Sequence, residues 1–288
     1  MPRPFLLCAF PFGYGPAAKL LVIEERLRAA GGRSVFVGAG IAHELVQRSA
    51  GLFEDVVAAR ASDPLARSLV SNAAGVVSVM DRGFAARAIE LDTPLYVVDS
   101  LLFIRDGIPA AFAGAKHYWV QNFPGVATHR VDSAASPTLV GPIVRDGVQR
   151  KPVVVPRLII NLGGYAAPAD NIDDHYAEFV LRGILNSPFV DFFGGKILVM
   201  GGAACVDRLR ARFENGDLEF TSLSHEAALE ELSRAAAVLT SPGLTTTTEC
   251  SARPPAMVRS WPLSDTPLTP RRWSSPMRAC WRNSGSER

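Results

Sequence analysis

The most chemically suggestive stretch of the sequence is Ser-Pro-Gly-Leu-Thr-Thr-Thr-Thr-Glu at positions 241–249. It follows the apolar run 235–239, which is typical of a buried strand. A Pro-Gly turn between a strand and a run of threonines predicts that a helix begins here, with its free N–H groups and positive dipole end directed at a ligand. Such a helix start suits a diphosphate, and Glu249 would lie where a carboxylate accepts hydrogen bonds from a ribose diol. Simple capping of a helix by these hydroxyl residues is the alternative.

Glycine pairs occur in two other predicted turns. Gly13 and Gly15 lie in the loop after the first apolar run, and Gly163 and Gly164 follow the apolar run 157–161. Glycine lets the backbone approach a ligand closely. We therefore count all four as candidate ligand-binding positions.

Three residues are candidate general bases. Asp81 ends the stretch "VVSVMDR" and Asp99 ends "LYVVDS", so each follows a predicted strand. Either one could instead cap the next helix. We favour Asp99, because its strand is the more hydrophobic and is expected to be the more central. His117 is the third candidate and begins the segment 117–126, whose aromatic and amide side chains could hold a planar acceptor or simply pack in the core.

Strand-like and helix-like segments alternate along the chain, which predicts parallel sheets covered by helices on both faces. The strands are expected at 5–10, 34–38, 56–58, 76–80, 95–98, 118–120, 138–140, 157–161, 196–200, 219–220 and 237–240. The helices are expected at 17–30, 41–49, 63–73, 83–91, 173–186, 207–213 and 225–235. The chain has 288 residues, enough for two domains. We therefore predict an α/β protein of two doubly wound, Rossmann-like domains, residues 1–147 and 153–251, that face each other across a cleft.

The second domain resembles the donor-binding domain of GT-B glycosyltransferases. The resemblance is carried by the Gly163-Gly164 turn, the strand before Gly201-Gly202, and the segment "FTSLSHEAALEELSRAAAVLTSPGLTTTTE". It is strongest to the branch that holds the peptidoglycan N-acetylglucosaminyltransferase and the UDP-glycosyltransferases. By this resemblance Ser222 and Leu223 contact the nucleotide base, and Glu249 binds the ribose. The diphosphate would be held by Gly243, Leu244, Thr245 and Thr246.

This resemblance implies metal-independent, inverting transfer of a sugar from a UDP-sugar donor to a small-molecule acceptor. No cofactor other than the donor substrate is implied, and no metal-binding Asp-x-Asp motif is found. The stretches "SVMDR", "VVDSL" and "YWVQNFPGV" also resemble cytosylglucuronate synthase type enzymes, which implies a nucleobase acceptor in nucleoside-antibiotic biosynthesis. The first loop lacks the histidine that often serves as base in the family. Two alternatives stay open: a UDP-sugar 2-epimerase and a degenerate protein that binds nucleotide-sugars without catalysis.

The amino-acid composition limits the kinds of partner that we expect this protein to bind. The formal net charge is +2 and 48% of residues are hydrophobic, so nothing points to nucleic acid or stable membrane insertion. The four cysteines are scattered, which favours a reducing cytoplasm over a disulfide framework or a zinc site. A homodimer is left open.

Residues 252–288 differ in character from the rest. They contain three of the four tryptophans, six prolines and seven arginines, without helical or strand periodicity. We interpret them as a disordered tail or as a coding region read out of frame. The second domain is accordingly expected to be incomplete, and the chain to be a poor catalyst.

Overall fold

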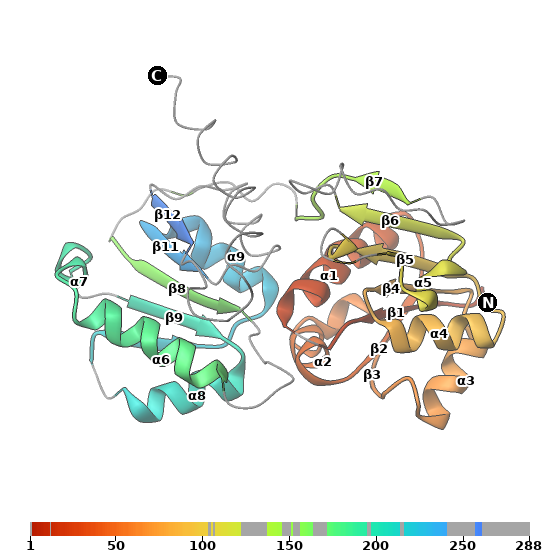
Figure 1. Cartoon of the computed structure of the whole chain (residues 1–288), viewed down its shortest axis with the longest axis horizontal. Coiled ribbons are helices and arrows are strands. Elements are labelled where there is room, and N and C mark those ends of the chain that lie inside the picture. The colour runs from red at the N-terminus through yellow and green to blue at the C-terminus, as the bar shows by residue number, and fades with distance from the viewer. Residues whose placement is uncertain are drawn as a thin grey trace, which may run out of the picture.

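The computed structural model consists of two parallel α/β domains that lie side by side (Figure 1). It describes residues 2–11, 13–102, 105, 107–121, 137–145, 151, 156–163, 172–194, 197–213, 216–240 and 257–260.

The first domain is built on one seven-stranded sheet in the order β3-β2-β1-β4-β5-β6-β7. Its strands are β1 (Phe5–Ala9), β2 (Ser34–Gly38), β3 (Asp55–Ala58), β4 (Gly75–Val79), β5 (Leu95–Asp99), β6 (His117–Gln121) and β7 (Thr138–Val140). Its helices are α1 (Tyr14–Ala29), α2 (Gly40–Gln47), the 3-10 turn η1 (Ala50–Leu52), α3 (Pro64–Asn72), α4 (Arg82–Glu90) and α5 (Ala110–Ala113). Every strand pair described in this sheet is parallel.

The second domain has a five-stranded parallel sheet in the order β10-β9-β8-β11-β12. Its strands are β8 (Leu158–Gly163), β9 (Ile197–Gly201), β10 (Leu218–Thr221), β11 (Ala237–Thr240) and β12 (Met257–Ser260). Its helices are α6 (Ile172–Leu185), α7 (Phe189–Phe192), α8 (Ala203–Arg212) and α9 (His225–Arg234).

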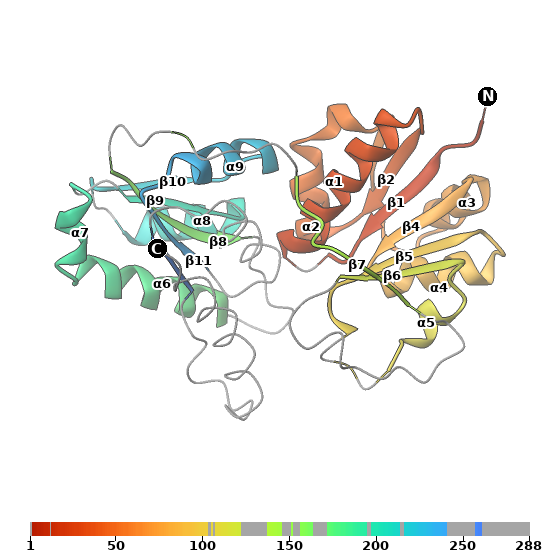
Figure 2. The ribbon, with the colours of Figure 1, turned by 90° about the horizontal axis from the view of Figure 1, so that it is seen from above.

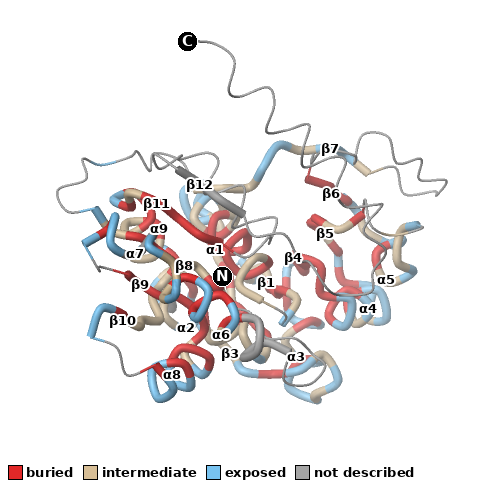
Figure 3. Tube along the Cα trace, turned by 60° about the vertical axis from the view of Figure 1, so that its left-hand side comes forward, coloured by how far each residue is buried: buried red, intermediate tan, exposed pale blue. Residues whose placement is uncertain are grey.

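Alternating burial along the strands explains why each sheet carries helices on both faces. In β1, Leu6 and Cys8 belong to the core cluster that includes Phe84 of α4, while Leu7 and Ala9 belong to the cluster on the opposite face. Successive side chains of a strand point to opposite faces, so a strand that is apolar throughout needs a helix on each side. Figure 3 shows the same arrangement as buried strands within more exposed helices.

The predicted α/β class and the two doubly wound domains are confirmed, and three details are corrected. β4, not β5, occupies the middle of the first sheet, so the expectation that the strand before Asp99 is the more central was wrong. Helix α8 begins at Ala203, four residues before the predicted start. The segment 252–288 is not without strand structure, because β12 extends the second sheet by pairing in parallel with β11.

The two domains meet along helices of both. Figure 2 shows α9 of the second domain next to α1 and α2 of the first. Within the described residues no helix is long and apolar enough to cross a bilayer.

Candidate functional site

Each sheet has a topological switch point, the place where the chain reverses the direction in which it adds strands. In the second sheet the chain runs from β8 outward to β9 and β10, and then returns to place β11 on the other side of β8. In the first sheet the corresponding neighbours are β1 and β4. Ligands of open α/β sheets bind outside the carboxyl ends of the strands at such points, because the two connections diverge there and leave a crevice.

The switch point of the second domain lies at the predicted nucleotide-binding turns. β8 ends at Gly163, whose φ of 63° is a conformation that favours glycine. Its amide donates to Asn161 Oδ1 at 3.0 Å, and its carbonyl accepts from Gly202 N at 3.1 Å. β11 ends at Thr240, from which the segment 241–249 continues the chain. Six predicted site residues lie outside the described residues: Gly164, Gly243, Leu244, Thr245, Thr246 and Glu249.

Ser222 and Leu223, predicted to contact the base, form the connection between β10 and α9. The Ser222 hydroxyl donates to Gly201 O at 2.7 Å, which ties this connection to the carboxyl end of β9. Leu223 O accepts from Arg48 of the first domain at 3.3 Å. Ser224 then caps α9 by accepting from Ala227 N at 3.2 Å. The predicted base-contacting residues are therefore held from both sides at the edge that faces the first domain.

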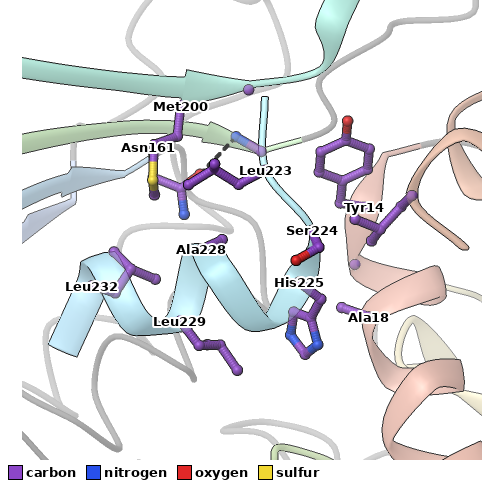
Figure 4. A pocket seen from close by; sticks show the side chains of 14 residues that line it. Tyr14, Ala18, Asn161, Met200, Leu223, Ser224, His225, Ala228, Leu229 and Leu232 are labelled. Atoms are coloured by element: carbon purple, nitrogen blue, oxygen red, sulfur yellow. Dashed lines mark hydrogen bonds between the residues drawn. The ribbon is translucent and has the colours of Figure 1, made fainter. Parts of the chain in front are cut away.

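A mostly apolar cavity of about 60 Å³ lies between the domains. Tyr14, Gly15 and Ala18 line it from α1, and Figure 4 shows Asn161, Met200 and Leu223 on the opposite side. A cavity of this size holds a few water molecules, so it is too small for a nucleotide. The cavity marks where the facing walls of the two domains approach each other.

The switch point of the first domain brings the first loop next to Asp81. Phe10 N donates to Val79 O at 3.0 Å, which joins the chain after β1 to the end of β4. Gly13 has a φ of 73° at the start of α1, so the turn requires a residue without a Cβ. Gly15 lies in the first turn of α1 and lines the cavity.

Asp81 caps α4 and is only 9% exposed. Its Oδ1 accepts from Phe84 N at 3.0 Å. Burial raises the pKa of Asp81, and the backbone N–H groups of Phe84 and Gly83 offset part of that effect. The preceding residue, Met80, has a φ of 63°, an uncommon conformation for a side chain other than glycine. A buried carboxylate with a raised pKa after a strained residue is an arrangement found at catalytic sites.

Asp99 has a different environment. Its side chain is fully buried and both oxygens are occupied: Oδ1 accepts from Leu101 N at 2.7 Å, and Oδ2 accepts from Tyr118 OH at 2.8 Å and from Arg105. Burial, and next the Asp99 charge, raise the pKa of Tyr118 far above its usual range. Three donors around one buried carboxylate make a structural cluster, so the geometry weighs against Asp99 as a base that reaches an acceptor.

His117 lies away from the cleft. It is the first residue of β6, at the amino end of the strand, and its exposed ring lies nearly parallel to the rings of Tyr96 and Trp119 at centroid distances of 5.9 and 5.5 Å. Its position at the amino end of β6 weighs against His117 as the general base, because ligands of such sheets bind at the carboxyl ends of the strands. Gln121 occupies the carboxyl end of β6, where it accepts from the Ser100 hydroxyl at 2.8 Å.

Sequence reasoning missed the residues that join the two domains at the site. Glu44 and Arg48 of the α2 region contact backbone atoms of the second domain. In the sequence they are spaced as an i, i+4 ion pair, which is usually a surface feature of one helix. Within the described ranges no group of three or more His, Cys, Asp or Glu side chains is placed to hold a metal ion.

Comparisons with known proteins identify the fold. No protein-family model matches the sequence, and no curated protein matches it. Several solved structures match along nearly the whole chain. Phytolacca americana UGT2, complexed with UDP-2-fluoroglucose and pterostilbene, has a TM-score of 0.53 at 12% identity, over 91% of this chain and 80% of that one. The spinosyn forosaminyltransferase SpnP has a TM-score of 0.52 at 11% identity, over 92% and 81%.

Arabidopsis thaliana UGT89C1, complexed with quercetin, is a third match, with a TM-score of 0.51 at 11% identity over 90% of this chain and 79% of that one. The architecture shared with these structures is the two-domain GT-B fold of glycosyltransferases. At this level of identity the likeness concerns the fold, and the function has to be argued from the site.

Proposed function

We propose that this protein is a glycosyltransferase that moves a sugar from a UDP-sugar to a small-molecule acceptor. The observation that carries the proposal is the strand order of the second sheet. It brings the carboxyl ends of β8 and β11 side by side, so that the Gly163 turn and the chain entering 241–249 leave the sheet at the same switch point. These are the turns whose composition suits a diphosphate and a ribose.

One of the matched structures supports this assignment of the donor. Phytolacca americana UGT2 is complexed with a UDP-sugar analogue together with a small aromatic compound. We transfer this pattern as follows: the second domain binds UDP through Ser222 and Leu223, with Glu249 on the ribose. Gly243, Leu244, Thr245 and Thr246 act on the diphosphate.

We propose Asp81 as the general base in preference to Asp99. Asp81 follows the central strand at the switch point of the first domain, whereas Asp99 is enclosed by three donors. The Asp81 carboxylate takes the proton from an acceptor O–H or N–H, and the acceptor atom attacks the anomeric carbon opposite the diphosphate. The bond from that carbon to the diphosphate oxygen breaks, UDP departs with the electron pair, and the configuration inverts. The helix start predicted at 241–249 stabilises the negative charge that develops on UDP.

The acceptor is proposed to bind at the carboxyl edge of the first sheet. We propose a nucleobase as a specific candidate, on the basis of the sequence resemblance alone.

The test uses the purified full chain. Calorimetry with UDP measures binding, and UDP release is followed with a panel of UDP-sugars, with and without cytosine and flavonoid acceptors. We expect UDP to bind and to be released faster when an acceptor is present. Formation of a second sugar nucleotide without acceptor would instead identify a 2-epimerase. Absence of UDP binding would overturn the proposal.

A binding protein without catalysis is the second candidate. It is favoured by one observation: Asp81 already caps a helix and Asp99 is already saturated, so neither carboxylate is uncommitted. UDP-sugar binding with no turnover on any acceptor would support it.

A further inference from the structure

A small polar cluster joins the first domain to the second. One oxygen of Glu44, Oε1, accepts three hydrogen bonds: from Ala203 N at 3.0 Å, from Tyr14 OH at 2.9 Å and from Arg48. Arg48 Nη1 in turn donates to Tyr14 OH at 2.9 Å and to Leu223 O at 3.3 Å. We call Tyr14, Glu44 and Arg48 the interdomain cluster. Across the cleft, Glu44 and Arg48 contact backbone atoms of the second domain, and Tyr14 also interacts with the Ser222 side chain.

The contact from Glu44 to Ala203 N supplies α8 with an N-terminal cap, which the helix's own N-cap residue does not provide. The N-cap residue of α8 is Gly202, which has no side chain to accept a hydrogen bond, and no acidic residue lies in the first turn. The first N–H groups of a helix need acceptors, and a negative charge near them is favourable. Glu44 provides both from the other domain. It therefore acts as the helix cap that the second domain does not carry itself.

The charge state of Glu44 agrees with this role. Burial would raise its pKa, but the hydrogen bonds from Ala203 N and Tyr14 and the charge of Arg48 outweigh burial and lower it. The carboxylate therefore stays ionised when the two domains are in contact, as a helix cap requires.

The packing around this contact is close. A Cβ placed on Gly202 would lie 3.6 Å from Tyr14 OH and 3.8 Å from Ile41 Cδ1, both ordinary contact distances. The surfaces therefore already touch at Gly202, and the small interdomain cavity begins next to them, lined by Tyr14 and Gly201. A side chain longer than alanine at 202 would push the two walls apart.

We propose that Glu44, Arg48 and Tyr14 are positioning residues that hold the two domains closed and orient the 222–223 connection for the nucleotide. The closing role rests on contacts within the protein alone. The effect on the nucleotide rests additionally on the proposed function. Because these residues bind the backbone of the donor domain, they set the affinity for the donor without touching it.

Two variants remove the same hydrogen bond from opposite sides. Glu44→Ala removes the acceptor. Ala203→Pro removes the donor at the first position of α8, where proline is well tolerated, and Gly202 already has the extended ψ of 143° that a residue before proline adopts. Glu54→Ala is the matched control, because Glu54 forms a half-exposed ion pair with Arg33 inside the first domain only.

We expect both variants to speed amide exchange in 203–212 and to increase the radius of gyration measured by small-angle scattering. UDP affinity should fall by about 5- to 150-fold, the range of typical coupling between sites. The KM for the UDP-sugar should rise more than kcat falls. The double variant should be no worse than Glu44→Ala alone, since Ala203→Pro removes only a hydrogen bond that Glu44→Ala has already removed. Glu44→Gln keeps an oxygen for Ala203 N and should recover the exchange protection in part.

Unchanged exchange and unchanged radius in both single variants would overturn the closing role, whether or not UDP binds. A changed radius with unchanged UDP affinity would overturn the positioning role while leaving the proposed function intact. If the native chain itself fails to bind UDP, the proposed function fails, and the exchange and scattering measurements still decide whether the cluster closes the cleft.

Discussion

Asp81 and Asp99 follow adjacent strands of the same sheet, yet they have different environments. Asp81 comes after the central strand β4, caps a helix and is slightly exposed, whereas Asp99 ends β5 with no exposed surface and three donors around it. Both could be described in the sequence as an aspartate after an apolar strand. The availability of a carboxylate at a strand end is therefore decided by the residues around it and not by the strand that precedes it.

The largest effect is expected from a variant that removes the charge of Asp81 but keeps its hydrogen bond from Phe84 N. Asparagine caps helices as well as aspartate does, so Asp81→Asn should keep the fold and remove the proposed base. We expect turnover to fall on the order of 10²- to 10⁴-fold, with little change in UDP affinity. Steady-state kinetics and calorimetry on the same preparation measure both. Turnover within about threefold of the native protein would remove Asp81 from the mechanism.

Removing Asp99 should affect folding instead. Asp99→Ala leaves Arg105 and Tyr118 without their buried partner, which for such pairs costs about 3–5 kcal/mol of stability. Urea denaturation gives the free energy of unfolding, and the folded fraction should keep its UDP affinity. A stable Asp99→Ala protein that binds UDP but has no turnover would reverse our assignment of the two carboxylates.

The pH dependence of turnover provides a further test of whether Asp81 is the group that accepts the proton. Burial raises the pKa of Asp81 above its ordinary value of about 4. A general base acts when deprotonated, so turnover should decrease as pH falls through the raised pKa, about tenfold per unit below it. In stability the sign is opposite: the raised pKa favours the protonated folded form, so stability is lost as pH rises from the ordinary pKa to the raised one and is constant above it. An acid limb that persists in residual Asp81→Asn activity would mean that another group titrates.

The smallest expected effect separates the capping role of Asp81 from its chemistry. Asp81→Ala removes the acceptor of Phe84 N and should lower stability by about 1 kcal/mol relative to Asp81→Asn. Thermal unfolding of the two variants side by side measures this difference. Equal melting temperatures would show that the cap contributes nothing.

The sequence predicted most helices and strands to within a few residues, because apolar periodicity and glycine or proline turns are local signals. It could not predict strand order, which depends on contacts between distant segments. That is why β5 was expected at the centre, where β4 lies. β12 was missed because only four residues, Met257–Ser260, follow a proline-containing stretch. The single-turn helices α5 and α7 are too short to show a period.

Of the candidate site, the sequence predicted the parts that depend on local signals and not those that depend on contacts between distant segments. The glycine turns at Gly13 and Gly163 were recognisable from composition, and both adopt the positive φ that explains their residue type. The role of Glu44 was not recognisable, because its partner Ala203 is 159 residues away and contributes only a backbone N–H. No side-chain pattern marks such a partner.

The borrowed cap on α8 has a consequence for anyone who recombines domains of such proteins. A second domain grafted onto a different first domain would bring α8 without Glu44, and the helix start next to the proposed donor site would fray. With a first domain that leaves room beside position 202, the graft could be made self-sufficient there, since Gly202 has the extended backbone of an ordinary N-cap and a serine or aspartate would accept from its own helix. Exchange of the second domain between such proteins is therefore limited by the lack of a capping side chain at position 202, rather than by the area of contact between the domains.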